Sequence, residues 1–322
     1  MIQIGEIIFV LGMHRSGTSA ITRLLNILGA DTGKQLLPGD NNNEKGFWEN
    51  RRLIKLHDQI LETLGSAWYD FRPNPSEWWL REDVQPFHHK ILEVLEQNFS
   101  SQVLMLVKDP RISRLLPFWL NLLQDTGGIP KCAIVMRNPL EVARSIERRD
   151  QFSLITSLYL WLVYTLESEL YSRDLARTVI KYEKTLTDSR STVDQLTSEL
   201  NVQWPVNLNK VQEVIDSELD ASLRHHTIID TPSDADDLIQ TALNLYQMIT
   251  SNPLNEIREY LDELRLEVYS EILQFHPFPK TLFETNKALF ETKRELRQTK
   301  EQSLQGTIRR MKLSVGRALK FK

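Results

Sequence analysis

Residues 6–19 read EIIFVLGMHRSGTS and join an apolar run to a loop bounded by two glycines. The run EIIFVL is typical of a strand that is buried on both faces of a parallel sheet. The loop of residues 12–19 has the spacing G-x-x-x-x-G-x-S, and apolar residues at helical spacing follow it from Ile21 to Leu28. A strand, a loop of this kind and a helix place backbone N–H groups around an anion such as phosphate. An unliganded turn is the alternative.

The loop differs from that of ATP- and GTP-hydrolysing proteins at one position. Thr18 follows Gly17 where those proteins carry a lysine that reaches the β- and γ-phosphates. The cation in this loop is Arg15. The sequence therefore disfavours a P-loop kinase and favours an anionic group held by Arg15, Ser16, Thr18 and backbone amides.

Other apolar runs complete a sheet pattern. VLMLV (103–107), CAIVM (132–136) and TVIKY (178–182) read as strands, each followed by a helix, such as the one predicted at 191–200. This alternation predicts a three-layer P-loop-type α/β domain over residues 1–230, with a central parallel sheet and ligands beyond the carboxyl ends of its strands. A helical extension (231–280) and a heptad-like helix with a basic tail (281–322) are expected to follow.

Composition excludes several classes of protein. The 322 residues carry 39 Lys and Arg against 43 Asp and Glu, and residues 308–322 hold six of the cations without an acid. The body is thus acidic, which disfavours nucleic-acid binding. Cys132 stands alone and no H-x-x-x-H pattern occurs, so we expect neither a disulfide nor a metal site.

Two apolar stretches bear on localisation. Residues 151–166 are too short to span a bilayer and predict a buried core helix instead. The N-terminus has no basic segment of the kind that opens a signal peptide. We therefore expect a cytoplasmic protein.

A second polar group follows the strand at 132–136. Arg137 ends that strand, Pro139 suits the first turn of the next helix, and Ser145 lies about two turns along it. A guanidinium and a hydroxyl in these places can hold one phosphate together. The alternative is an arginine on a helix surface.

Together, GMHRSGTS and RNPLEVARSIERR resemble the sulfotransferases that use 3′-phosphoadenosine 5′-phosphosulfate (PAPS). Further similarities are KDPR at 108–111, Tyr182-Glu183 and LRHH at 223–226, and the resemblance covers about residues 7–226. It implies that the first loop holds the 5′-phosphosulfate and that Arg137 and Ser145 hold the 3′-phosphate. The implied donor-binding residues of the first loop are His14, Arg15, Ser16, Gly17, Thr18 and Ser19. The implied co-substrate is PAPS, its product is PAP, and no metal is required.

Departures from the family leave the general base open. The cytosolic members have a histidine in a K-T-H-L-P stretch, which is absent from KDPR here, and their G-x-x-G-x-x-K segment is missing too. Glycan- and tyrosine-directed members use a glutamate after the first helix. Glu49 is the first candidate, because Phe47 and Trp48 could desolvate it and favour proton uptake near neutral pH. Glu44 is the second and His57 the third, while Arg15, helped by Lys108, would neutralise the developing charge.

The sequence says less about the acceptor of the sulfuryl group and about binding partners. The resemblance implies sulfuryl transfer to a hydroxyl or amine, and we expect a carbohydrate or glycolipid acceptor. The aromatic side chains at 68–79 could stack on a sugar. A non-catalytic scaffold in a surface-polymer assembly is the alternative of another class. The tail at 308–322 could lie on an anionic membrane surface or be disordered, and residues 282–305 could self-associate or form a solvated helix.

Overall fold

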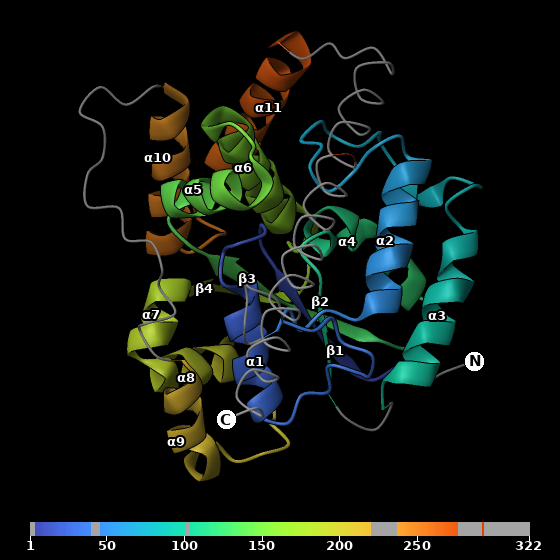
Figure 1. Ribbon diagram of the computed structural model, residues 1–322, viewed down its shortest axis with the longest axis vertical. Helices are drawn as coiled ribbons and strands as arrows, with labels where there is room; N and C mark the ends of the chain where they lie inside the picture. The colour runs from blue at the N-terminus through green and yellow to red at the C-terminus, as the bar shows by residue number, and fades with distance from the viewer. Residues whose placement is uncertain (1–3, 40–45, 101–103, 220–236, 276–291, 293–322) are drawn as a thin grey trace, which may run out of the picture. The chain divides into compact units, whose positions relative to one another are not determined.

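A computed structural model describes residues 4–39, 46–100, 104–219, 237–275 and 292 (Figure 1). Glu44, the LRHH segment, the heptad-like stretch apart from residue 292, and the basic tail lie outside these residues. The predicted domain limits near residues 230 and 280 also fall there, so that division stays a prediction. Contacts along the chain group it into two units, residues 1–270 and 271–322.

In the described part of the chain, four parallel strands form the sheet, in the order β2-β1-β3-β4. They are β1 (Glu6–Leu11), β2 (Met105–Lys108), β3 (Ile129–Met136) and β4 (Ala176–Lys181). The α/β class and the parallel sheet are thus confirmed. One boundary is wrong: Tyr182 was expected at the end of the fourth strand but begins α7 (Tyr182–Thr187), because its ring turns in to pack against Gly17.

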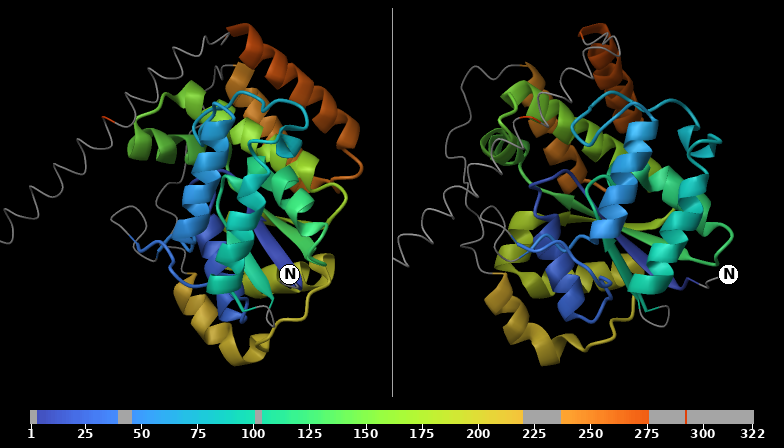
Figure 2. Two further views of the ribbon diagram at one scale, coloured as in Figure 1. Left: turned by 90° about the vertical axis from the view of Figure 1, so that its right-hand side faces the viewer. Right: turned by 45° about the vertical axis from the view of Figure 1, so that its right-hand side comes forward.

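Helices cover both faces of the sheet, which gives the predicted three layers (Figure 2). Alternate residues of β1 point to opposite faces. Ile8 and Val10 pack among residues of α1 (Thr18–Ile27), α8 (Ser189–Leu200) and α9 (Leu208–Glu218). Phe9 points the other way and contacts Trp119 of α4 (Ile112–Leu123), with ring centroids 5.2 Å apart.

Further helices flank these layers. The predicted core helix is confirmed as α6 (Leu154–Tyr171), most of which is buried, and it packs against α4, α5 (Pro139–Asp150) and α10 (Asp237–Ser251). On the side of β2, α2 (Arg51–Thr63) packs against α3 (Pro86–Asn98), and the short η1 (Trp78–Leu80) contacts α4. The last described helix is α11 (Arg258–Phe275). Within the described ranges, no helix has both the length and the apolar character needed to cross a membrane.

Candidate active site

The polar loops singled out in the sequence meet at one edge of the sheet. β1, β2 and β3 are neighbouring parallel strands, so the loops that follow Leu11, Lys108 and Met136 leave the sheet at the same side. The chain crosses from β2 to β3 over β1, which makes the end of β1 the point where ligands bind in open α/β sheets.

The loop after β1 forms an uncapped helix start. Gly12, Arg15 and Gly17 have φ angles of 137°, 72° and 91°, so the chain turns tightly before α1. Asn50 and Asn138 cap α2 and α5 with their side chains, whereas among the described residues no side chain caps α1. The first N–H groups of a helix have no partner within it and favour an anion. This helix start therefore suits a phosphate or sulfate oxygen.

Ser16 gives a second, independent sign of a ligand at this loop. Its side chain is 1% exposed. Its hydroxyl has no hydrogen-bond partner within the part of the chain that the structure describes. Buried hydroxyls are normally satisfied, because leaving one unpaired costs about 1–3 kcal/mol. An anion in the loop would supply the missing acceptor.

Tyr182 closes the loop from the side of β4. A methyl group added at Gly17 would lie 2.1 Å from the Tyr182 ring, so only glycine fits there. The Arg137 guanidinium lies over the Tyr182 ring, 5.0 Å from its centroid. Burial raises the pKa of Tyr182, and the charges of Arg137 and Arg15 act against that rise. Tyr182 thus ties the first loop to the arginine that follows β3.

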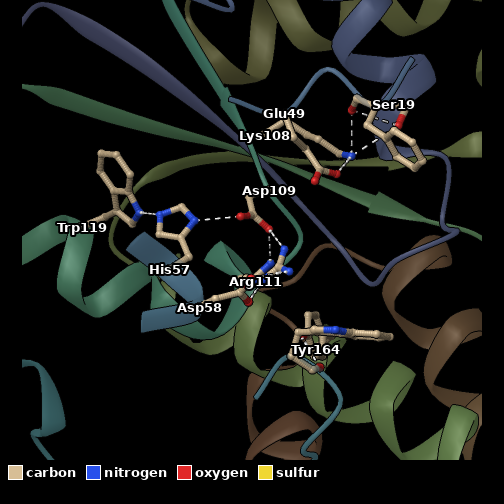
Figure 3. Close-up of polar contacts among 11 residues, drawn as sticks. Ser19, Glu49, His57, Asp58, Lys108, Asp109, Arg111, Trp119 and Tyr164 are labelled. Carbon is tan, nitrogen blue, oxygen red and sulfur yellow. Dashed lines mark hydrogen bonds and ion pairs between the residues drawn. The ribbon is translucent and has the colours of Figure 1, made fainter. Parts of the chain in front are cut away.

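Lys108 joins two other predicted site residues, Ser19 and Glu49, at the start of α1 (Figure 3). Its ammonium forms a buried ion pair with Glu49 and donates to Ser19 Oγ at 3.3 Å and to the Phe47 carbonyl at 3.0 Å. Glu49 is therefore brought beside the loop, as its candidacy requires. Its side chain is buried, and its carboxylate is paired with Lys108, a contact that the reasoning from Phe47 and Trp48 did not include.

His57 lies in a buried network and not at the site surface. Its Nδ1 is 2.8 Å from Asp109 Oδ2, and the Trp119 indole N–H donates to its Nε2 at 3.1 Å (Figure 3). Since an indole nitrogen only donates, Nε2 is the acceptor and the ring proton is on Nδ1. Both nitrogens are occupied and the side chain is fully buried. The structure thus gives no support to His57 as a general base.

Asp109 connects His57 to an arginine that the sequence analysis left without a role. Arg111 donates to Asp109 Oδ1 from Nη1 at 2.9 Å, and to Asp58 from Nε at 2.6 Å. Burial alone would raise the pKa of Asp109, but Arg111 and His57 hold it below its ordinary value. Asp109 is consequently a permanent anion that fixes Arg111.

Arg137 and Ser145 each have hydrogen-bond partners within the protein, and their joint binding of a phosphate stays a prediction. Pro139 does open α5, and Ser145 is buried on it. However, Ser145 Oγ accepts a hydrogen bond from Arg15 Nε at 2.8 Å, while Arg137 Nε donates to Glu141 Oε2 at 2.9 Å. Arg137 also donates from Nη1 to the Arg15 carbonyl at 3.2 Å. The first loop and the second polar group are therefore in direct contact.

His14 faces an aromatic loop. Its ring meets Trp68 edge to face, with centroids 4.5 Å apart. Burial lowers the pKa of His14 well below its ordinary value, and the charges of Arg149, Arg111 and Lys108 lower it further, against a smaller effect of Asp109. His14 is therefore neutral at pH 7.

Buried polar groups hold the Trp68 loop in place. Tyr164 of α6 donates from its hydroxyl to the Trp68 carbonyl at 2.7 Å. Arg114 donates to the carbonyls of Asp70 and Arg72 and pairs with Glu167 at 3.0 Å. The sequence analysis did not consider the pair of Arg114 and Glu167. The sequence did contain a signal for it, because Arg114 is a charged residue within the otherwise apolar helix α4.

No group of three or more His, Cys, Asp or Glu that could hold a metal occurs in the described ranges. No protein-family model matches the chain. No curated protein matches it in sequence either.

Two solved structures have a similar arrangement of elements. One is the sulfotransferase domain of the olefin synthase from Synechococcus PCC 7002, with 16% identity, a TM-score of 0.44, and coverage of 79% of this chain and 98% of that one. The other is the sulfotransferase domain from the curacin biosynthetic pathway, with 18% identity, a TM-score of 0.42, and coverage of 76% and 98%.

Proposed function

We propose that the protein is a sulfotransferase that moves the sulfuryl group of PAPS to an acceptor hydroxyl or amine, with a carbohydrate or glycolipid hydroxyl as the preferred acceptor. The observation that carries the proposal is a pair of cationic groups at one sheet edge. Lys108 stands at the uncapped start of α1, and Arg137 and Ser145 both contact Arg15. PAPS has two anionic groups, a 5′-phosphosulfate and a 3′-phosphate, which this arrangement can hold.

The residues of the chain would divide the work of the transfer. The amides at the start of α1 and the Ser16 hydroxyl would bind the 5′-phosphosulfate. Arg15, helped by Lys108, would neutralise charge on the leaving phosphate oxygen. In the step itself, the acceptor oxygen bonds to sulfur, the bond from sulfur to that phosphate oxygen breaks, and PAP leaves with the bonding electrons. Glu49 would take the acceptor proton, because its carboxylate lies beside Lys108 and the loop.

Two alternatives to this function are a P-loop kinase and a non-catalytic scaffold. A P-loop kinase needs a lysine at the position of Thr18, and this chain therefore lacks the group that reaches the transferred phosphate. A scaffold would bind the nucleotide without transferring anything. We also keep peripheral membrane contact through residues 308–322, and self-association through 282–305, as proposals that rest on the sequence pattern alone.

The test is a screen for transfer with no assumption about the acceptor. The full chain is incubated with PAPS labelled with ³⁵S and a mixture of glycans, glycolipids and small hydroxyl compounds, with heat-denatured protein as control. We expect a labelled product and one PAP for each sulfuryl group transferred. PAP binding without labelled product would favour the scaffold, and transfer of ³²P from labelled ATP would establish the kinase.

A further inference from the structure

Two segments of the chain meet in three side-chain contacts beside the proposed reaction site (Figure 3). One segment runs from residue 49 into α2, and the other is the KDPR segment that ends β2. The three contacts are those of Glu49 with Lys108, His57 with Asp109, and Asp58 with Arg111. The transfer proposed above uses only the first. The second and third are here called the α2 clamp.

His57 forms the buried half of the clamp. Its Nδ1 lies 2.8 Å from Asp109 Oδ2, and Trp119 donates to its Nε2 at 3.1 Å. The imidazole is thus held from both sides, by the end of β2 and by α4. A hydrogen bond to a carboxylate is stronger away from water than in it, and both partners here are buried. This contact therefore fixes the middle of α2 against the end of β2.

Asp58, the next residue of α2, forms the outer half of the clamp. It accepts from Arg111 Nε at 2.6 Å and from Nη2 at 3.3 Å, the two-point contact of a carboxylate with a guanidinium. Arg111 also donates from Nη1 to Asp109 Oδ1 at 2.9 Å, so the two halves share Asp109. Because the Asp58 side chain is 50% exposed, this half can be opened without changing the core.

The clamp acts on Glu49 through the helix that joins them. Asn50 caps α2 with its side chain, and Glu49 directly precedes this cap. In the other segment, Asp109 directly follows Lys108. Hydrogen bonds behind a reacting group keep it in its productive geometry. The contact of His57 with Asp109 therefore determines how the Glu49 carboxylate meets the Lys108 ammonium.

The backbone before Glu49 needs such support. Trp48 has a φ of 60°, in the left-handed region that a bulky residue rarely adopts. A residue in this region keeps its conformation only where the surrounding structure holds it. The Phe47 carbonyl accepts from Lys108 at 3.0 Å, and the Leu37 N–H donates to the Glu49 carbonyl at 2.7 Å. The orientation of Glu49 thus depends on contacts with distant segments.

We propose that His57 is a positioning residue: through the α2 clamp it holds Glu49 against Lys108 in the arrangement that proton transfer from the acceptor needs. The catalytic part of this role rests on the proposed function. It gives His57, the third candidate for the general base, a role in which its ring exchanges no proton with the acceptor.

Acylation of lysines tests the clamp without any need for transfer. The native full chain is treated with acetic anhydride, and mass spectrometry of its peptides gives the rate at which each lysine reacts. Lys108 and Lys131 are matched, since their side chains are 3% and 5% exposed and each pairs with a glutamate. Lys131 lies on β3 and reports general loosening. We expect His57→Leu to raise the rate at Lys108 by roughly tenfold and at Lys131 by less than about twofold.

His57→Asn tests which property of the side chain matters. Its amide can still donate to Asp109, but it loses the contact with Trp119. The labelling rate of Lys108 should therefore lie closer to that of the wild type than to that of His57→Leu. Rescue by a smaller polar side chain would not occur if the ring served only to fill the core.

Asp58→Asn opens the outer half and carries the test if His57→Leu does not fold. It removes the charge that pairs with Arg111 and should raise the labelling rate of Lys108 by about threefold. The control is Asp83→Asn, because the Asp83 side chain is also 50% exposed and pairs with Arg81 at 2.6 Å. This control should leave the rate at Lys108 unchanged.

Turnover connects the clamp to catalysis. With the acceptor found in the ³⁵S screen, His57→Leu should lower kcat by roughly 10- to 100-fold while the KM for PAPS stays within about threefold, since misplacement by about 1 Å has effects of this size. The number of PAP sites per chain, from calorimetric titration, corrects kcat for any unfolded protein. His57→Asn should recover most of the lost turnover.

A Lys108 that stays protected in both His57→Leu and Asp58→Asn would overturn the inference. Equal increases at Lys108 and Lys131 would also overturn it, because His57 would then support the fold in general. Faster labelling of Lys108 with unchanged kcat would remove the catalytic part of the role. A wild-type protein that transfers nothing from PAPS would contradict the proposed function, while the labelling rates would still decide whether the clamp holds Glu49 against Lys108.

Discussion

At the scale of single residues, Glu49 carries the most specific chemical role. Glu49→Gln keeps the shape of the side chain but removes the proton acceptor, and it leaves Lys108 with a neutral partner. We expect PAP affinity within a few fold of wild type and a fall in turnover of roughly 10²–10⁴, measured as PAP released from PAPS. Glu93→Gln on α3 is the matched control, since the Glu93 side chain is 47% exposed and pairs with His89. Full turnover in Glu49→Gln would move the role to Glu44.

His14 gives a residue-scale prediction about pH. Its pKa is lowered in the folded protein by burial and by Arg149, Arg111 and Lys108, so the unfolded chain binds a proton that the folded chain does not. The free energy of unfolding should therefore decrease as the pH is lowered below about 6.5, the ordinary pKa of histidine, and this contribution should be complete above that pH. The contribution is about 1.4 kcal/mol for each unit by which the pKa is lowered.

Chemical unfolding at pH 5 and pH 7.5 measures this effect. His14→Gln removes the titrating group, so the stability difference between the two pH values should be smaller in the variant than in the wild type. An equal difference in both proteins would show that His14 is protonated in the folded state at pH 5.

At the scale of elements, the loop before α1 depends on the contact of Gly17 with Tyr182. In Gly17→Ala the new methyl group would lie 2.1 Å from the Tyr182 ring, at a φ of 91°. Gly65→Ala is the control: its φ is 67°, but nothing lies within 4 Å of the added methyl. The control should lose about 1–2 kcal/mol from the left-handed backbone alone, and Gly17→Ala about 1–3 kcal/mol more from the clash.

Equilibrium unfolding in urea gives both stability values. PAP titration adds a second readout, since displacement of Tyr182 also disturbs Arg137, which lies over its ring. If the two variants lose the same stability and both bind PAP normally, Tyr182 does not hold the loop.

The helices α4 and α6 offer a second test at this scale. Arg114 and Glu167 form an ion pair in which both side chains are fully buried. Arg114→Met leaves a buried carboxylate without its main partner and should cost about 3–5 kcal/mol of unfolding free energy. Arg114→Met combined with Glu167→Gln removes the unpaired charge and should be more stable than the single variant. A double variant less stable than Arg114→Met would contradict this explanation.

At the scale of the whole molecule, the apolar runs predicted most of the fold. Continuous runs such as CAIVM predicted buried parallel strands because both faces of the sheet are covered, and Gly12 with Gly17 predicted the loop before α1. Strand ends moved by a few residues, since pairing continues into polar residues such as Lys108, which aligns with Val10 of β1.

The site was only partly predictable, because its contacts join distant segments. The sequence singled out Glu49, Lys108, Arg15 and Ser145, but not the pairing of Glu49 with Lys108 or of Arg15 with Ser145. The first pair is 59 residues apart in the chain and the second 130. Hydrogen-bond and ion-pair partners at such distances leave no periodic pattern, so only the fold shows which of the possible pairs forms.

The central claim is that this sheet edge binds a nucleotide with a 3′-phosphate and a 5′ anionic group. The most direct measurement compares thermal unfolding of the full chain with PAP, with AMP and with ATP and Mg²⁺. At a hundredfold excess over its dissociation constant, PAP should stabilise the protein by roughly 2.7 kcal/mol, while AMP stabilises it less and ATP with Mg²⁺ leaves the melting temperature unchanged. Stabilisation by ATP with Mg²⁺ and none by PAP would contradict the account.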